Sequence, residues 1–326
     1  MASAMGKEMA KICLLEMVTC KEGVLLDSLI IHKSTTSFRK ELSLFLYHCI
    51  RLYIMAKKKI GLYSTLESSF NNKVEDLYLI VDNEQIIFSV KNNTNGQFVA
   101  FEHFVNSPDN VGWHQLIAYL QNNSKLIQSI FNNVFFVWNS ARYLLTKKQI
   151  KEDTLLYQQE LDLVHGMSSE EELYLKQLDD NKMLVFSVPD ALSTLLSRTF
   201  PTGKWHHFAE FVYTIPVQNA ALVFLFDNSF YLRLVKEGKT KLINTYPMEG
   251  ADQNCYTILN TGANVFTDLG HTELFVWGSS QAKDEFINGV LPYFSSFQLV
   301  NIENGSIAHS LNTNYPNHIY SPYLIF

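Results

Sequence analysis

Three short motifs in this chain resemble sites of chemistry, and each is better explained as structure. Gly238-Lys239-Thr240 is similar to the end of a phosphate-binding loop, but the earlier glycine that such a loop needs is Arg233, so we interpret the tripeptide as a turn. His206-His207 has no third metal ligand at suitable spacing, which favours a role at a helix start or an interface. Cys255 lacks a sequence-visible catalytic partner, and its predicted helical position indicates burial as a small apolar residue. The sequence therefore predicts no catalytic residue and no metal site.

A repeated pattern offers a better candidate for a site. Asp82-Asn83-Glu84 follows one apolar segment, and Asp227-Asn228-Ser229 follows another. Phe136-Val137-Trp138-Asn139-Ser140 returns as Phe275-Val276-Trp277-Gly278-Ser279, in the same order and at a similar separation from its acidic turn. This repeat predicts two copies of one folding unit. Turn formation explains the two aspartates even without a ligand, since aspartate is favoured in turns.

Composition restricts the classes of function. The chain has 326 residues, enough for two domains, and a formal net charge of -6. Its longest basic run, Lys57-Lys58-Lys59, is too short to attract a nucleic acid. The four cysteines show no CxxC spacing, and the apolar stretch Leu42 to Ile54 is interrupted by His48 and Arg51. We therefore expect a cytoplasmic protein that does not span a membrane and does not bind nucleic acid.

The first 54 residues differ in character from the rest of the chain. They are rich in cysteine and methionine and lack strand alternation. Met55-Ala56-Lys57-Lys58-Lys59 then has the style of a bacterial start. We expect residues 1–54 to be an N-terminal extension or the product of a mis-assigned start. The alternative is a genuine helical appendage over residues 40–54.

Each copy of the repeat predicts the same series of elements. Apolar alternation and turn signals indicate three strands, and helical spacing followed by an apolar run indicates a helix and a fourth strand. In the first copy these are strands 77–81, 85–90 and 97–105, helix 113–131 and strand 134–138. In the second they are strands 221–226, 230–235 and 241–246, helix 252–266 and strand 274–277, followed by helix 282–294 and strand 297–302.

The segment between the copies predicts further elements. Met183 to Val188 has the composition of a strand, and Pro189-Asp190 opens a helix that runs from Ala191 to Phe200. Glu160 to Gln177 is polar and contains Glu170-Glu171-Glu172, which we interpret as the solvated face of a helix or loop. We place the first unit at residues 55–210, with this helical insertion, and the second at 211–326, with a C-terminal tail.

The elements predict an α/β fold with mixed sheets. Three antiparallel strands, a helix, a strand, a helix and a strand form the ribonuclease H-like unit, and two tandem units form the actin-like ATPase arrangement with a cleft between them. From Leu77 to about Ile302 the chain resembles an uncharacterised family of Bacteroidetes proteins, the domain-of-unknown-function family numbered 3822. The turns at Asp82 and Asp227, Phe186-Ser187-Val188-Pro189 and Trp277-Gly278-Ser279-Ser280 carry this resemblance.

The resemblance implies an actin-like fold, and nucleotide-binding proteins of that class hold phosphates with two Asp-x-Gly turns. The corresponding cleft would be formed here by Asp82, Asp227, Ser229 and Gly278. Glu84 stands where the first glycine is expected, and its carboxylate would repel a phosphate. Ser229 replaces the second glycine, and Gly278 stands alone where a Gly-Gly pair is expected. Both turns thus keep the aspartate but lack the glycine that lets the backbone amides approach a phosphate closely.

These departures favour a non-catalytic scaffold that binds another protein and needs no cofactor. The alternative is a weak ATP binder or ATPase, with magnesium, that uses other phosphate contacts. A ribonuclease H-like nuclease is disfavoured because Trp138-Asn139 and Trp277-Gly278 end the fourth strands without a carboxylate. For the aromatic tail from Tyr315 to Phe326 we expect packing on the second unit, with docking to a partner as the alternative.

Overall fold

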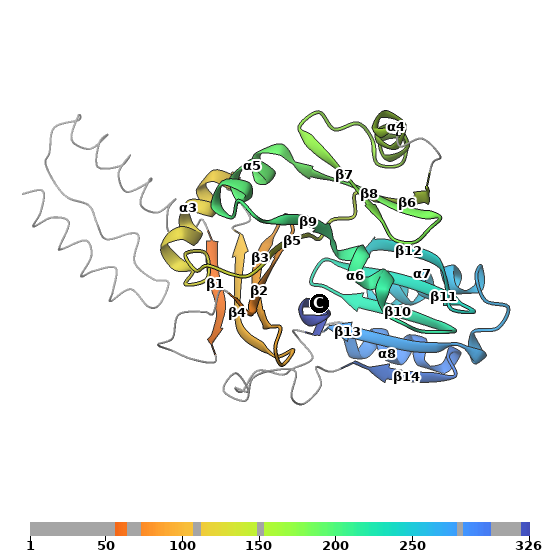
Figure 1. Ribbon diagram of the computed structural model, residues 1–326. Coiled ribbons are helices and arrows are strands. Elements are labelled where there is room, and N and C mark those ends of the chain that lie inside the picture. Colours follow the sequence, from red (N-terminus) through yellow and green to blue (C-terminus); the bar gives the residue numbers. More distant parts are fainter. Residues whose placement is uncertain (1–55, 64–72, 107–111, 149–152, 279–282, 301–320) are drawn as a thin grey trace, which may run out of the picture. The chain divides into compact units, whose positions relative to one another are not determined.

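The computed structural model describes residues 56–63, 73–106, 112–148, 153–278, 283–300 and 321–326 (Figure 1). All of them belong to one compact unit, Ile54–Phe326. The predictions for residues 1–54 and for a start at Met55 lie outside the described residues, as does the first half of the aromatic tail. The division between residues 210 and 211 stays a prediction.

The first sheet has six strands in the order β1-β4-β3-β2-β5-β9. β2, β3 and β4 are joined antiparallel, while β5 and β9 continue the sheet parallel to β2. The sequence predicted β2 to β5, and two strands that it did not predict, β1 and β9, form the edges of the sheet. The bounds are β1 Ala56–Tyr63, β2 Glu75–Val81, β3 Gln85–Asn92, β4 Phe98–Asn106, β5 Val134–Trp138 and β9 Lys204–His207.

Two helices belong to this half of the chain, α3 Trp113–Asn123 and α5 Asp190–Thr199. The prediction that the first helix continues to residue 131 was wrong. Ser124 leaves the helix because its hydroxyl bonds the buried Glu102 carboxylate and accepts hydrogen bonds from the backbone of Leu126 and Ile127. A local hydrogen-bonding alternative to the helix thus ends it about two turns before the apolar pattern does.

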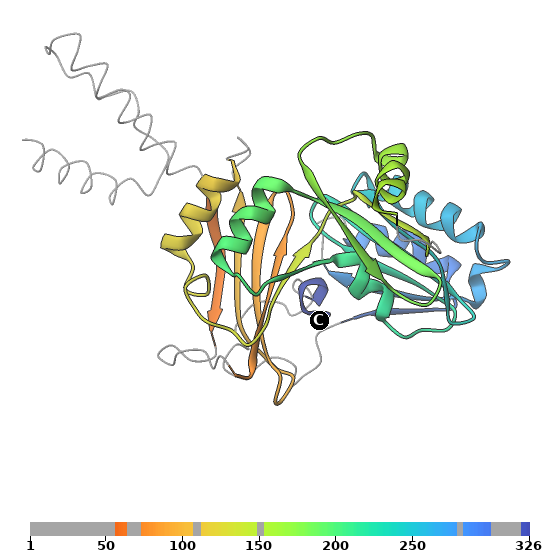
Figure 2. The same cartoon turned by 45° about the horizontal axis from the view of Figure 1, so that its top comes forward.

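The second sheet repeats the order and directions of five strands of the first, as β12-β11-β10-β13-β14. β10, β11 and β12 are antiparallel, and β13 and β14 are parallel to β10. Helices α7 and α8 lie against each other beside this sheet (Figure 2). The bounds are β10 Ala220–Leu225, β11 Ser229–Lys236, β12 Lys239–Pro247, α7 Ala251–Ala263, β13 Glu273–Gly278, α8 Lys283–Val290 and β14 Ser296–Leu299.

The two sheets differ in register next to the acidic turns. Val81, which precedes Asp82, pairs with Trp138. Trp277 pairs with Phe224, two residues before the Phe226 that precedes Asp227. The two tryptophans lie on different faces of their sheets, because Trp138 contacts Trp113 of α3 whereas Trp277 stacks on Phe224, on the face away from α7 and α8. The offset also moves Gly278 back along its strand relative to the second turn.

A separate three-stranded sheet, β6-β8-β7, follows β5 in the chain. Its elements are β6 Tyr143–Lys147, α4 Thr154–His165, β7 Glu171–Gln177 and β8 Lys182–Pro189. The prediction of a solvated helix or loop over 160–177 was therefore wrong for its second half. The acidic run is also more than a solvent face, because Glu171 pairs with Arg142 and Glu172 accepts hydrogen bonds from Tyr174 and Ser193. Arg142 and Ser193 lie outside this segment of the sequence, so its local polarity concealed the strand.

Helix α6, Phe208–Thr214, joins the two large sheets, and the buried Arg233 on β11 holds its end. The guanidinium donates to the carbonyls of Val212 and Ile215 at 2.8 and 2.7 Å and to the hydroxyl of Thr240 at 3.0 Å. Burial lowers its pKa to about 10, which leaves it charged at neutral pH. The arginine therefore donates hydrogen bonds to carbonyl groups that would otherwise lack a partner at the end of the helix.

Replacement of this arginine tests that role. We expect Arg233→Ala to lower the free energy of unfolding by roughly 2–4 kcal/mol, because buried carbonyls lose a charged donor. Urea unfolding followed by circular dichroism measures the change. Arg198→Ala, at an exposed position on α5, is the matched control and should change stability little. Equal small losses for the two variants would contradict the assignment.

Candidate functional site

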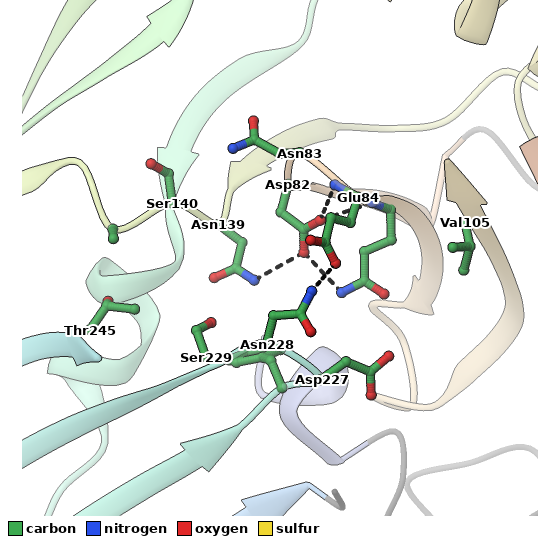
Figure 3. A pocket seen from close by; sticks show the side chains of 13 residues that line it. Asp82, Asn83, Glu84, Val105, Asn139, Ser140, Asp227, Asn228, Ser229 and Thr245 are labelled. Atoms are coloured by element: carbon green, nitrogen blue, oxygen red, sulfur yellow. Dashed lines mark hydrogen bonds between the residues drawn. The ribbon is translucent and has the colours of Figure 1, made fainter. Parts of the chain in front are cut away.

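A pocket of about 210 Å³ lies where the two acidic hairpins face each other (Figure 3). The first hairpin is the β2–β3 turn and the second is the β10–β11 turn, and the segment after β5 closes the pocket from the side. The structure thus brings together three of the predicted residues, Asp82, Asp227 and Ser229. The lining residues are Asp82, Asn83, Glu84, Gln85, Val105, Asn139, Ser140, Ala141, Phe226, Asp227, Asn228, Ser229 and Thr245.

Asp82 organises the first hairpin through its carboxylate. Oδ1 accepts hydrogen bonds from the backbone amides of Glu84 and Gln85, both at 2.8 Å. Oδ2 accepts from the side-chain amides of Gln85 at 2.8 Å and Asn139 at 3.5 Å. Both oxygens are therefore used by the protein itself, as expected for an aspartate that shapes a turn.

The electrostatics around this carboxylate oppose further negative charge. Burial raises the pKa of Asp82 to about 6. The negative charge of Glu84 raises this pKa further, whereas the hydrogen bonds from Gln85 and Glu84 lower it. His103 reaches the same group through Gln85, whose Oε1 lies 2.8 Å from His103 Nε2. Burial, with a contribution from Lys59, lowers the pKa of His103 to about 4, so this imidazole is neutral at pH 7.

The second hairpin is more open and bonds to the first. Asp227 is 66% exposed and forms a 3.8 Å ion pair with Lys59, which lies at an irregularity in β1 and is 46% exposed. A pair this exposed contributes little to stability. The side-chain amide of Asn228 donates a hydrogen bond to the carboxylate of Glu84, as Figure 3 shows. The tips of the two hairpins are thus linked across the pocket.

Gly278 is not among the residues that line this pocket. It ends β13 with a φ of +87°, and a Cβ atom there would lie 2.3 Å from the carbonyl oxygen of Leu225 and 2.9 Å from Pro322. Its amide donates to the hydroxyl of Ser321 at 2.9 Å. Within the described residues, close approach of the backbone and of the C-terminal turn accounts for the glycine.

The other motifs have structural roles in the described fold. The side chain of His207 caps α6 by accepting from the amide of Ala209, and its Nε2 donates to the carbonyl of Ser140 at 3.1 Å. This confirms the helix-start interpretation for His207, while His206 lies 2.9 Å from Glu210. Gly238, with a φ of +70°, forms the predicted turn between β11 and β12, and Cys255 is buried on α7 as predicted. In the part of the chain that the structure describes, no group of three metal-binding side chains occurs.

Sequence reasoning missed several lining residues. Asn139 and Ser140 directly follow β5, the parallel neighbour of β2, so the carboxyl ends of adjacent parallel strands could have indicated them. No comparable feature of the sequence indicated that Gln85 and Thr245 line the pocket. None of the described helices is both long and apolar enough to cross a membrane.

Comparison with known proteins assigns the fold. A family model described as "Protein of unknown function (DUF3822)" matches residues 65–297. A Bacteroides thetaiotaomicron protein with an actin-like ATPase fold and unknown function superposes with a TM-score of 0.61 and 14% identity, over 74% of this chain and 93% of its own. The chain therefore has the actin-like ATPase fold.

More distant similarities extend to proteins of other systems. The PilM–PilN type IV pilus biogenesis complex gives a TM-score of 0.47 at 11% identity, over 78% of this chain and 96% of the matched one. Ethanolamine utilization protein EutJ from Carboxydothermus hydrogenoformans gives 0.38 at 9% identity, over 80% and 93%. No curated protein gives a significant match.

The raised pKa of Asp82 predicts a pH dependence of stability. Folding raises the pKa of Asp82 above 3.8, so the folded state favours the protonated carboxyl. The stability that protonation of Asp82 gives to the folded state is fully present below the unfolded pKa, and it is lost as the pH rises from 3.8 through about 6. Carbon-13 NMR of the aspartate carboxyls should show one titration near pH 6.

The variant Glu84→Gln should lower the titration midpoint of Asp82, because it removes the neighbouring negative charge. It should also flatten the fall in stability over the same pH range. Glu273→Gln, at an exposed site at the opposite end of β13, is the control and should leave both unchanged. A midpoint near 4 in the unmodified protein would refute the assignment.

Proposed function

We propose that this chain, which belongs to the DUF3822 family, is a non-catalytic actin-like scaffold that binds another protein in the cytoplasm. The observation that carries the proposal is the hydrogen bond from Asn228 to Glu84. It joins the tips of the two hairpins that nucleotide-binding proteins of this class, as implied by the resemblance, use to hold phosphates. A bond between the two tips opposes the entry of a phosphate between them.

The charge of the pocket supports the same conclusion. Three carboxylates line it, those of Asp82, Glu84 and Asp227, and no lysine or arginine does. Lys59 reaches only the exposed Asp227. A phosphate would meet these carboxylates at short range in a partly desolvated site, where like charges repel more strongly than in water.

The size of the pocket is a further support. Its volume of about 210 Å³ is below the roughly 300–1,000 Å³ that is typical of small-molecule sites. The turns also lack the glycines through which backbone amides approach a phosphate, since Glu84 and Ser229 occupy those positions. Size, charge and backbone access all oppose nucleotide binding.

The second candidate is a weak ATP binder or ATPase with non-standard phosphate contacts. One observation favours it, namely that both hairpins face a common pocket. Asn83, Asn139 and Ser229 could donate hydrogen bonds there in place of backbone amides. The two candidates predict opposite responses to nucleotide.

Titration with Mg-ATP separates the two candidates. We expect no saturable rise in melting temperature up to millimolar Mg-ATP, because a ligand that binds only the native state must stabilise it. Differential scanning fluorimetry measures the response, with Mg-ADP as a second ligand. The matched variant Glu84→Gly/Asn228→Gly removes the link between the hairpins and tests whether it is the obstacle. A saturable rise in the unmodified chain would establish the second candidate.

An exposed apolar surface on α4 supports the protein-binding part of the proposal. Leu163 is 87% exposed and Met167, just beyond the helix, is 92% exposed, while Leu155, Leu156 and Val164 are exposed to lesser degrees. We name these five residues the α4 patch. Exposed large apolar side chains gathered on one helix are candidates for a contact surface. The expected partner therefore presents an apolar surface of its own.

A charge in the α4 patch should abolish partner binding without disturbing the fold. We expect Leu163→Asp to lose proteins that the unmodified chain retains from native lysate, as measured by quantitative mass spectrometry. Ile130→Asp, at an apolar position 71% exposed outside the patch, is the control and should retain them. Size-exclusion chromatography of both variants tests whether the patch instead mediates self-association. Identical retention by the two variants, with unchanged size, would exclude this surface.

A further inference from the structure

The two faces of the six-stranded sheet are covered in different ways. On one face, Trp113 and Tyr119 of α3 contact Trp138 and Phe104. The strand registers place Tyr78, Gln85, Ile87, His103 and Val137 together on the opposite face, and most of them are buried. Something other than the helices α3 and α5 must therefore cover that second face.

The C-terminal turn, Ser321–Phe326, supplies much of this cover. The ring of Phe326 stacks on Tyr78 with centroids 4.8 Å apart and meets Phe211 of α6 edge-on at 4.6 Å. Tyr323 lies 6.4 Å from His103, and its phenol oxygen accepts a hydrogen bond from Gln85 at 3.1 Å. Residues 238 positions apart in the sequence thus form one buried cluster.

The same turn also contacts the second sheet. The hydroxyl of Ser321 accepts from the amide of Gly278, and Tyr323 packs edge-on against Phe226 at 5.5 Å. Pro322 lies so close to Gly278 that any side chain there would collide with it. The prediction that the tail packs on the second unit is therefore incomplete, since its described part joins both sheets. Figures 1 and 2 both show the C-terminus between them.

Gln85 connects this turn to the pocket. Its side-chain amide donates both to Tyr323 and to Asp82, the residue that shapes the first hairpin. Phe226, a further contact of Tyr323, directly precedes Asp227 in the second hairpin. One aromatic side chain from the end of the chain is therefore in direct contact with the base of each hairpin.

We propose that the C-terminal turn is a strap that holds the two sheets together and keeps the two hairpins in their closed position. Tyr323 couples the strap to Asp82 through Gln85, and Phe326 anchors it on Tyr78. Release of the strap would free both hairpins at once, which makes it the point at which the pocket can be opened. The inference holds whether or not the pocket binds a nucleotide.

Hydrogen exchange of full-length variants tests the strap. Tyr323→Phe keeps the ring and removes the hydrogen-bond acceptor, so it should raise amide exchange in a peptide spanning residues 80–86 by about fivefold, the effect of one lost hydrogen bond. Phe326→Ala should raise exchange there and also in peptides over 226–230 and 208–214. Peptides from β8, in the separate three-stranded sheet, should stay unchanged in both variants and show that the fold persists.

Tyr256→Phe is the matched control, because its ring is 62% exposed on α7, away from the turn. It should leave exchange in all these peptides unchanged. Unchanged exchange of residues 80–86 in both Tyr323→Phe and Phe326→Ala would overturn the proposal. So would changes confined to residues 273–278, because the turn would then belong to the second sheet alone.

Discussion

Every residue of strand β10 is buried, and the arrangement of both sheets depends on this constraint. Ala220, Leu222 and Phe224 face a core shared with the first sheet and α6, whereas Ala221, Val223 and Leu225 face the core beneath α7 and α8. A strand buried on both faces needs a layer on each side, as in other parallel or mixed sheets. The second sheet obtains one layer from its own helices and the other from the opposite half of the chain, so the halves share one core.

Contacts around this shared core hold the two hairpins opposite each other. The two halves of the chain meet through α6, the C-terminal turn and the tips of the two hairpins. At each of these places, hydrogen bonds pair polar groups of different elements. Arg233 holds the end of α6, Gln85 joins Asp82 to Tyr323, and Asn228 bonds Glu84. In the described chain the two hairpin turns are thus bonded to each other and to the C-terminal turn.

Much of the fold could be predicted because its signals are local. Apolar alternation around Asp82-Asn83 and Asp227-Asn228 located four strands and both hairpins, and the candidate residues Asp82, Asp227 and Ser229 do share one pocket. β7 was missed because its acidic side chains are satisfied by Arg142 and Ser193, which the local sequence does not reveal. Gly278 was placed with the site because its segment repeats, but a two-residue offset in register and Pro322 determine its surroundings.

The sequence by itself determined the elements, the repeat, the family resemblance and the loss of glycine from both turns, since each follows from neighbouring residues and their backbone preferences. Only the tertiary structure decided which residues bond to these two turns. Glu84 and Asn228 are 144 residues apart, and Gln85 and Tyr323 are 238 apart. No local pattern encodes such a pair, because each partner alone is an ordinary polar residue. Packing around the buried strand β10 brings these partners together, so the two hairpins line one pocket.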